Sequence, residues 1–273
     1  MELIATYWPY LAGLLATGFI AGVLAGLLGV GGGIVVVPVL YIILTALGME
    51  ESVRMHVAVG TSLATIIPTS MRSLSSHAKR GAVQWDVLKG WGPGLFIGTL
   101  IGTALAGLAD AEILQLVFGV IAFGVAVNMA FGPTYQRDVV AVPRGAKGFS
   151  IGTGIGTLSA MMGIGGGTLG VPILTYCGLL AQKAVATASG FGLIISIPGA
   201  IGFAVTGWDV ANLPPTSLGY VNLAGFALIS PMTVLSAPLG VAAAHALPTQ
   251  RLKQAFALFL AITAAKMIYD FLV

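Results

Sequence analysis

The stretch Gly29-Val-Gly-Gly-Gly-Ile-Val-Val-Val-Pro-Val-Leu40 returns 134 positions later as Gly163-Ile-Gly-Gly-Gly-Thr-Leu-Gly-Val-Pro-Ile-Leu174. Aligning residues 18–41 with residues 152–175 gives ten identical pairs in twenty-four positions, and six of the ten are glycine. The chain around both stretches is almost wholly apolar. A glycine-rich break that occurs twice in apolar sequence is typical of a membrane transporter built from two copies of one unit.

The composition indicates an all-α polytopic integral membrane protein. The chain has 273 residues, of which 57% are hydrophobic and only 8% are charged, whereas soluble domains carry about 25% charged residues. A membrane-spanning helix needs about 20 apolar residues, and runs near this length occur at 8–28, 55–76, 91–109, 112–131, 184–206, 218–246 and 254–272. Shorter apolar runs occur at 38–47, 148–163 and 168–181. We expect about eight to ten membrane segments, because the short runs can be half-helices or tilted spans.

The charges between these runs predict how the chain is oriented in the membrane. Cytoplasmic loops carry an excess of Lys and Arg, and the basic loops lie at 72–89, 137–147 and 251–253. The turn Ala109-Asp-Ala-Glu112 and the loop at 207–215 contain no Lys or Arg, so we place both outside. The net charge of +3 therefore reflects membrane topology rather than nucleic-acid binding.

The basic loop 72–89 of the first half is equivalent to the loop at 207–215 of the second, and the turn 109–112 is equivalent to the basic turn 251–253. The two loops of each pair are therefore placed on opposite faces of the membrane. We therefore divide the chain into a first membrane repeat, 1–132, a cytoplasmic linker, 133–147, and a second membrane repeat, 148–273, with inverted topology. The N-terminus carries no Lys or Arg before its first apolar run. It lacks the basic start of a cleavable signal peptide and is interpreted as the first membrane segment.

Each glycine break predicts a locally unwound backbone. Pro38 and Pro172 favour the first turn of a helix, because proline has no N–H to lose there. The residue before a proline is biased toward extended geometry, so we expect residues 29–37 and 163–171 to be unwound and half-helices to start at the two prolines. The N-terminal end of a helix carries roughly +0.5 elementary charge and free N–H donors, so two such ends can bind an anion without a charged side chain.

The predicted substrate site combines backbone and hydroxyl donors. Its backbone part comes from Gly29, Gly31, Gly32, Gly33, Gly163, Gly165, Gly166 and Gly167. Thr61, Ser62 and Ser189 lie at similar positions in the two halves, and Thr168 lies within the second break where the first has Ile34. These hydroxyls can donate to an anion or bond back to the preceding helical turn, and both readings stay open.

Other small and charged residues have simpler interpretations. The spacing of four predicts helix-packing ridges at Gly18-Gly22-Gly26, Gly94-Gly98-Gly102 and Gly148-Gly152-Gly156. Lys266 and Asp270 are spaced as an i,i+4 ion pair, for which a structural role is expected.

No enzyme, metal or cofactor is expected. Residues 148–152 match the nucleophile pattern Gly-x-Ser-x-Gly, but no strand-turn-helix context surrounds them. The three histidines, His56, His77 and His245, have no metal-ligand spacing between them. The single cysteine, Cys177, excludes a multi-cysteine metal site.

The pattern Ala25-Gly-Leu-Leu-Gly-Val-Gly-Gly-Gly33 with Pro38, the segment Ala58-Val-Gly-Thr-Ser62 and the repeated Gly163-Ile-Gly-Gly-Gly167 resemble the sulfite exporter TauE/SafE family. The resemblance covers nearly the whole chain. It implies an integral membrane protein of the bacterial inner membrane that moves small anions, such as sulfite, sulfoacetate, related organosulfonates or carboxylates. The chain departs from a symmetric pattern at Ser189-Gly190, where the first half has Thr61-Ser62.

Both lines of reasoning lead to a secondary transporter, and specifically an exporter, for a small anion such as sulfite or an organosulfonate. Alternating access between the inverted repeats would move the anion past the two breaks. The expected partners are this anion, the lipid bilayer and a coupling H⁺ or Na⁺. The alternatives are a carrier of a carboxylate or another solute coupled to Na⁺ or H⁺, a passive anion channel, and a membrane scaffold without transport.

Overall fold

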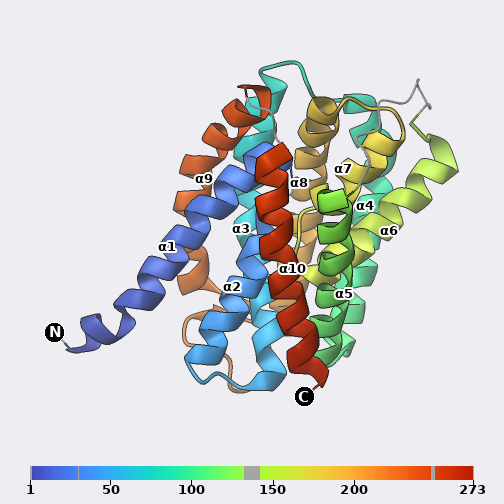
Figure 1. The fold of residues 1–273 in the computed structure, drawn as a ribbon. Helices are drawn as coiled ribbons and strands as arrows, with labels where there is room; N and C mark the ends of the chain where they lie inside the picture. Colours follow the sequence, from blue (N-terminus) through green and yellow to red (C-terminus); the bar gives the residue numbers. More distant parts are fainter. Residues whose placement is uncertain (1, 30, 132–141, 247–249, 273) are drawn as a thin grey trace.

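The computed structural model describes residues 2–29, 31–131, 142–246 and 250–272, and in these ranges the chain is almost entirely helical (Figure 1). The expected all-α architecture is confirmed. Inside a bilayer every backbone N–H and C=O must find a partner within the protein, and a helix provides these partners locally. This requirement explains why the β-branched run at 34–37 is helical rather than extended.

The first half contains α1 (Glu2–Leu28), α2 (Gly33–Ala46), α3 (Glu51–Ala78), α4 (Trp85–Leu108) and α5 (Ala111–Phe131). The second half contains α6 (Gly145–Met162), α7 (Gly167–Tyr176), α8 (Ala181–Thr206), α9 (Leu223–Ala246) and α10 (Gln250–Leu272). A short hairpin of β1 (Ser217–Leu218) and β2 (Val221–Asn222) precedes α9 and pairs Ser217 with Asn222. Each predicted apolar run overlaps one of these helices, and the run at 218–246 begins inside the hairpin.

Among the described residues, five helices are long and apolar enough to cross a membrane. They span Tyr10–Leu28, Trp85–Leu108, Ala111–Phe131, Ala181–Thr206 and Leu223–Ala243. α3 is as long as these, with 28 residues, but it is more polar. Its Ser, Thr and His side chains are mostly buried inside the bundle instead of facing lipid.

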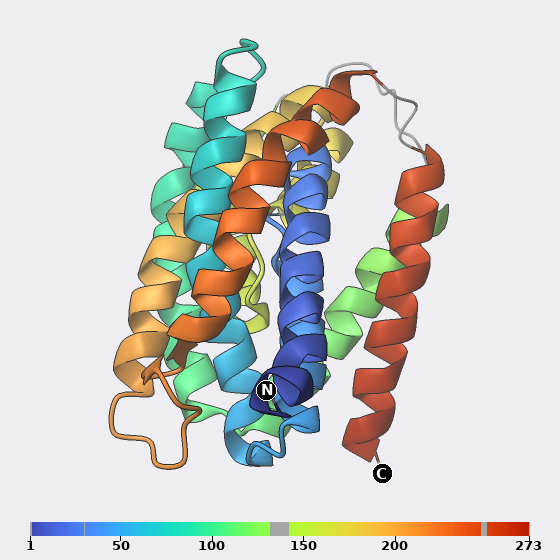
Figure 2. The ribbon, with the colours of Figure 1, turned by 90° about the vertical axis from the view of Figure 1, so that its left-hand side faces the viewer.

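The helices form one bundle with two distinct ends (Figures 1 and 2). The α3–α4 loop at 79–84 and the start of α6 at 142–147 lie together at one end, which we call the basic end. The turn at 109–110 and the loop at 207–222 lie at the opposite end, which we call the acidic end. Residues 133–141 of the predicted linker lie outside the described residues, and so do the side chains of the predicted basic turn at 251–253.

Glycine allows two pairs of helices to pack backbone against backbone. The ridge of α1 faces α9, where a Cβ on Gly26 would collide with the carbonyl oxygen of Ala237. The ridges of α4 and α6 face each other, and a Cβ on Gly98 would collide with the carbonyl oxygen of Thr153. Small residues permit this close approach in membranes, where van der Waals packing drives helix association. The predicted packing ridges are confirmed.

The predicted starts of the half-helices are wrong. α2 begins at Gly33 and α7 at Gly167, so Pro38 and Pro172 lie inside their helices, each at the sixth residue. The unwound segments shrink from 29–37 and 163–171 to about one turn each. A proline in a helix removes one intrahelical hydrogen bond, whereas five more unwound residues would leave several backbone groups without partners. α7 has ten residues, and α2 is longer, with 14.

Candidate functional site at the two glycine breaks

The two glycine breaks meet inside the bundle. A Cβ on Gly33 would collide with the carbonyl oxygen of Gly163. A Cβ on Gly31 would lie 3.4 Å from the Cα of Gly165. Only glycine lets two backbones approach this closely, so the repeated motif builds one shared site from two distant segments.

Ser62 connects α3 to the second break. Its hydroxyl donates a hydrogen bond of 2.7 Å to the carbonyl oxygen of Gly163, and both residues are buried. Gly163 caps the C-terminus of α6 in the left-handed region, with φ of 66°. The last carbonyl groups of a helix have no intrahelical partner. The Ser62 hydroxyl supplies a donor for one of them, the Gly163 carbonyl at the edge of the unwound segment.

Both half-helices begin without a side-chain cap. Gly32 is the N-cap of α2, with φ of 80°, and Gly166 is the N-cap of α7; neither position makes a side-chain capping hydrogen bond. The first N–H groups of a helix have no intrahelical partner, and the helix dipole adds positive potential there. The N-terminal end of a helix can bind a small anion through these N–H groups.

Two hydroxyls at the second break have no hydrogen-bond partner within the described ranges. Thr168 is the second residue of α7 and is 3% exposed, and Ser159 lies in the last turn of α6 and is fully buried. The Ser159 carbonyl accepts a bond of 3.0 Å from the N–H of Ile164, which fixes it to the break. A buried polar group without a partner costs about 1–3 kcal/mol, so both hydroxyls are available to a ligand.

Sequence reasoning missed Ser159, although the aligned repeat contained the signal. In the alignment of residues 18–41 with 152–175, Ser159 stands opposite Ala25 and Thr168 stands opposite Ile34. The second break therefore has two hydroxyls where the first has apolar side chains. The shared site is polar mainly on the side of the second break.

Thr61 and Ser189 are buried, and their hydroxyls are engaged elsewhere. Thr61 Oγ1 accepts a bond of 2.8 Å from the N–H of Asn222, in the hairpin before α9. The Ser189 hydroxyl donates to the carbonyl oxygen of Ala186, 2.7 Å away in the preceding turn. Contact of these two side chains with substrate stays a prediction.

The hairpin at 217–222 covers the acidic end of α3, a feature that the sequence did not reveal. Asn222 fixes it at both sides, because its N–H donates to Thr61 while its Oδ1 accepts a bond of 2.8 Å from the N–H of Gly225. The second bond caps the N-terminus of α9. A Cβ on Gly60 would lie 2.6 Å from the carbonyl oxygen of Tyr220, so the hairpin rests directly on α3.

Aromatic stacking strengthens this closure. The Tyr220 ring stacks on His56, with ring centroids 4.7 Å apart. His56 Nε2 lies 3.0 Å from the carbonyl oxygen of Ala106 and 3.1 Å from that of Ala109, at the C-terminal end of α4. Burial raises the pKa of the Tyr220 hydroxyl, so the ring packs as a neutral group.

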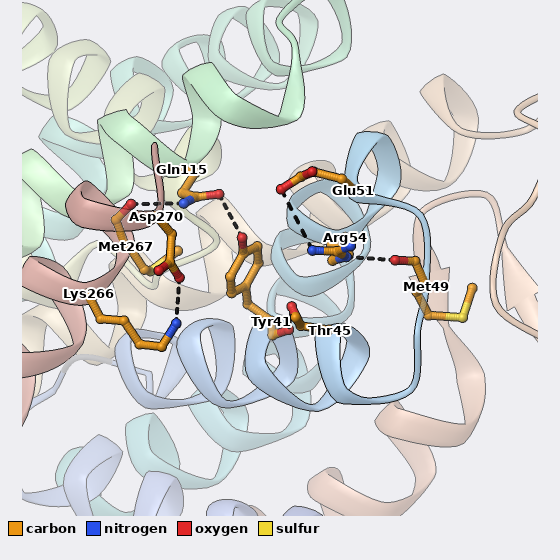
Figure 3. Close-up of polar contacts among 9 residues, drawn as sticks. All are labelled: Tyr41, Thr45, Met49, Glu51, Arg54, Gln115, Lys266, Met267 and Asp270. Atoms are coloured by element: carbon orange, nitrogen blue, oxygen red, sulfur yellow. Dashed lines mark hydrogen bonds and ion pairs between the residues drawn. The ribbon is translucent and has the colours of Figure 1, made fainter. Parts of the chain in front are cut away.

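A polar network fixes α2 to its neighbours near the acidic end (Figure 3). Tyr41 of α2 donates a bond of 2.9 Å to Gln115 Oε1 on α5, and Gln115 Nε2 donates one of 2.8 Å to the carbonyl oxygen of Met267 on α10. Both side chains are buried. α7 has Thr175 at the position equivalent to Tyr41 in the repeat, and its hydroxyl bonds back to the carbonyl oxygen of Val171. At this position α2 is therefore bonded to a neighbouring helix, whereas α7 is bonded to itself.

The charged residues around this network pair locally (Figure 3). Lys266 Nζ lies 2.5 Å from Asp270 Oδ2, which confirms the predicted i,i+4 spacing. Arg54 Nε donates to the carbonyl oxygen of Met49 at 2.6 Å, and Arg54 Nη1 lies 3.7 Å from Glu51 Oε1. These contacts stabilise the α2–α3 turn and the C-terminal end of α10. Neither segment is part of the glycine breaks.

The buried polar side chains of the described residues can each donate a hydrogen bond, and they include no carboxylate. They comprise Ser and Thr hydroxyls, His56, His77 and Gln115. Within the same ranges no group of three His, Cys, Asp or Glu side chains could hold a metal ion. Backbone N–H groups and hydroxyls favour an anion over a cation, which prefers carboxylate and carbonyl oxygens.

Comparisons with known proteins give the family. Residues 14–267 match the family model described as sulfite exporter TauE/SafE. A "probable membrane transporter protein" of Haemophilus influenzae is 34% identical over 255 residues, which cover 93% of this chain and 96% of that protein. One of Methanocaldococcus jannaschii is 29% identical over 227 residues, covering 83% of this chain and 81% of that protein.

A further relative from Bacillus subtilis is 26% identical over 280 residues, covering 94% of this chain and 97% of that protein. No solved structure matches this chain. The apolar helices and the transporter relatives together show a multi-pass integral membrane protein that acts as a membrane transporter. The chain belongs to the sulfite exporter TauE/SafE family.

Proposed function

We propose that this protein is a secondary transporter that exports a small oxyanion, such as sulfite or an organosulfonate, past the two glycine breaks. The observation that carries the proposal is the meeting of the breaks, where Gly33 at the start of α2 packs against the carbonyl oxygen of Gly163 at the end of α6. Both half-helices, α2 and α7, begin beside this contact without side-chain caps. Such a site offers N–H donors and positive potential but no fixed charge. The family description adds sulfite as the first candidate.

The proposal includes inverted repeats, 1–132 and 148–273, joined by the linker 133–147. Three observations support it. α1 packs against α9 as α6 packs against α4, and α2 packs against α3 as α7 packs against α8. The first helix of each half enters the bundle from an opposite end (Figure 1). Two opposed halves around one central site can expose it alternately to either side of the membrane.

We place the protein in the bacterial inner membrane with its basic end in the cytoplasm. The loop within 72–89 and the described part of 137–147 lie at the same end of the bundle. Clustering of Lys and Arg on one side is the pattern that positive-inside topology produces. In this orientation the hairpin at 217–222 closes the outer side of the site.

Flux measurements in proteoliposomes test the proposed function. Purified protein is reconstituted, and the uptake of labelled sulfite, sulfoacetate, lactate and phosphate is measured with and without a pH or Na⁺ gradient. Saturable flux of sulfite or sulfoacetate supports the proposal. Saturable flux of lactate alone would replace it with a carboxylate carrier, non-saturable flux with a channel, and no flux of any anion would overturn transport of this class.

A further inference from the structure

One face of α3 carries polar side chains from the glycine breaks toward the basic end. Ser62, Thr65, Thr69 and Ser73 are three or four residues apart, so they share one face of the helix. We call these four residues the hydroxyl stripe. Each of them is no more than 1% exposed. His77, one turn further, continues the same face, and its Nε2 lies 3.2 Å from the carbonyl oxygen of Gly26 on α1.

α9 lies against this stripe and adds hydroxyls of its own. The hydroxyl oxygens of Thr69 and Thr233 are 2.6 Å apart, which joins the two helices. Thr233 also donates to the carbonyl oxygen of Ser230, at 2.8 Å. Both α9 residues are buried, with exposures of 1% and 7%. Two helices of the bundle thus meet through polar groups rather than through an apolar seam.

Three hydroxyls in this region have no partner in the part of the chain that the structure describes. They belong to Ser70, Ser73 and Ser230. Ser70 Oγ faces α8, because a Cβ on Gly192 would lie 2.5 Å from it. Each unpartnered buried hydroxyl costs about 1–3 kcal/mol. A packing seam made of alanine or glycine would avoid this cost, so the Ser73 and Ser230 hydroxyls are candidates for contact with a ligand, whereas Ser70 faces α8 instead.

The equivalent positions of the other half carry no hydroxyl. Pro68 of α3 and Pro198 of α8 occupy the same place in their helices, as do Pro93 of α4 and Pro231 of α9. In this register Thr65, Thr69 and Ser73 correspond to Ile195, Gly199 and Phe203, and Ser230, Thr233 and Ser236 correspond to Gly92, Leu95 and Gly98. At these six equivalent positions, hydroxyls therefore occur only on the side between the breaks and the basic end. Thr99 and Thr103 of α4 are buried on the other side, where each bonds to its own helix.

We infer that the passage between the glycine breaks and the basic end runs between α3 and α9, and that a small oxyanion moves along it past the hydroxyl stripe. The inference rests on the proposed function, because it takes the anion from that proposal. The Ser73 and Ser230 hydroxyls have no partner in the described ranges to give up, so they can replace part of the hydration shell that an anion loses on entering the bundle. Thr69 and Thr233 can do the same by releasing the carbonyl oxygens that they now bond. The equivalent positions on the acidic side carry no hydroxyl, so the two halves of the route differ in chemistry.

Cysteine accessibility tests the route without requiring transport. The background carries Cys177→Ala, and single cysteines replace Ser73 or Thr233 in the stripe region. Ala186→Cys is the matched control, because Ala186 is fully buried and lies five residues from the basic end of α8, as Ser73 does in α3. The probe is sulfonatoethyl methanethiosulfonate, a negatively charged reagent, applied to inside-out vesicles.

We expect Ser73→Cys and Thr233→Cys to react about tenfold faster than Ala186→Cys, because a thiol must meet water to ionise and react. Sulfoacetate should slow both reactions and leave the control unchanged. Equal rates at all three positions, or rates that sulfoacetate does not alter, would overturn the route.

Hydroxyl removal gives a second measurement. Thr69→Val and Thr233→Val keep the volume of the side chain, and Thr99→Val and Thr103→Val on α4 are controls, since these buried hydroxyls bond only to their own helix. Sulfite flux in proteoliposomes should fall about tenfold in the first pair and stay unchanged in the second. Absent flux in the unmodified protein would count against the proposed function. Normal flux in the first pair, together with unreactive stripe cysteines, would count against the route alone.

Discussion

The Ser62 hydroxyl of α3 donates a hydrogen bond of 2.7 Å to the carbonyl oxygen of Gly163, 101 residues further along the chain. The bond ties a helix of the first half to the unwound backbone of the second. In the proposed transport cycle the site opens to one side of the membrane at a time. The bond between Ser62 and Gly163 is one of the contacts that hold the two halves together at the site. Its loss should affect stability and transport alike.

Ser62→Ala should lower the stability of the protein. The Gly163 carbonyl would lose its donor while staying buried, which costs about 1–3 kcal/mol. Thermal unfolding in detergent measures the change. Ser189→Ala is the matched control, because the Ser189 hydroxyl bonds only to the preceding turn of its own helix, and it should unfold close to the unmodified protein. Equal unfolding temperatures for the two variants would contradict the role given to Ser62.

Tyr41→Phe should also destabilise the protein, because it leaves Gln115 Oε1 buried without its donor. The expected loss is about 1–3 kcal/mol in the free energy of unfolding, measured by denaturation in detergent. Tyr269→Phe serves as the control, since Tyr269 is 63% exposed. A Tyr41 variant as stable as the Tyr269 variant would show that the network does not hold α2.

Asn222→Ala should cost about 1 kcal/mol through loss of the N-cap of α9. Asn222→Asp keeps an oxygen that accepts from the Gly225 N–H but loses the Nδ2 donor to the Pro215 carbonyl oxygen and Ser217 Oγ. It should retain the part of the stability that comes from the cap. The unfolding temperatures of the two variants are compared, and the difference between them measures the contribution of the capping bond. Identical losses would mean that the capping bond is not what Asn222 contributes.

Gly98→Ala should be strongly harmful, and Gly124→Ala should be harmless. A Cβ on Gly98 would collide with the Thr153 carbonyl, whereas no heavy atom lies within 4 Å of a Cβ on Gly124. Forcing α4 and α6 apart costs about 1–3 kcal/mol or more, while alanine in an open helix position gains about 0.5–1 kcal/mol over glycine. Yield and unfolding temperature of the two variants check this contrast, and comparable values would exclude close packing at Gly98.

Much of the fold could be predicted from the pattern of apolar runs and glycines. Helix content, the packing ridges and the Lys266–Asp270 pair depend on local spacing, which a sequence displays directly. The starts of α2 and α7 could not be predicted from Pro38 and Pro172, because the need to pair backbone groups inside a membrane outweighs the preference of proline for a first turn.

The site was predictable only in part. The glycines indicated where two backbones approach, but which hydroxyls stay unbonded depends on neighbours distant in sequence. Thr61 meets Asn222 across 161 residues, and no local pattern announces that contact. The aligned repeat sets Ser159 opposite Ala25, but only the packing of α6 shows that the Ser159 hydroxyl has no partner among the described residues.

The most direct test of the central claim, that the glycine breaks bind the transported anion, is the KM for sulfite of Thr168→Val in proteoliposomes. The Thr168 hydroxyl has no partner among the described residues, so its removal should not lower the unfolding temperature. The KM should rise about tenfold or more, because a hydrogen bond to a charged ligand contributes about 1.5–3 kcal/mol. Thr175→Val, on the same half-helix with a hydroxyl that bonds to its own helix, should keep the original KM. An unchanged KM for Thr168→Val in a protein that transports sulfite would contradict the claim.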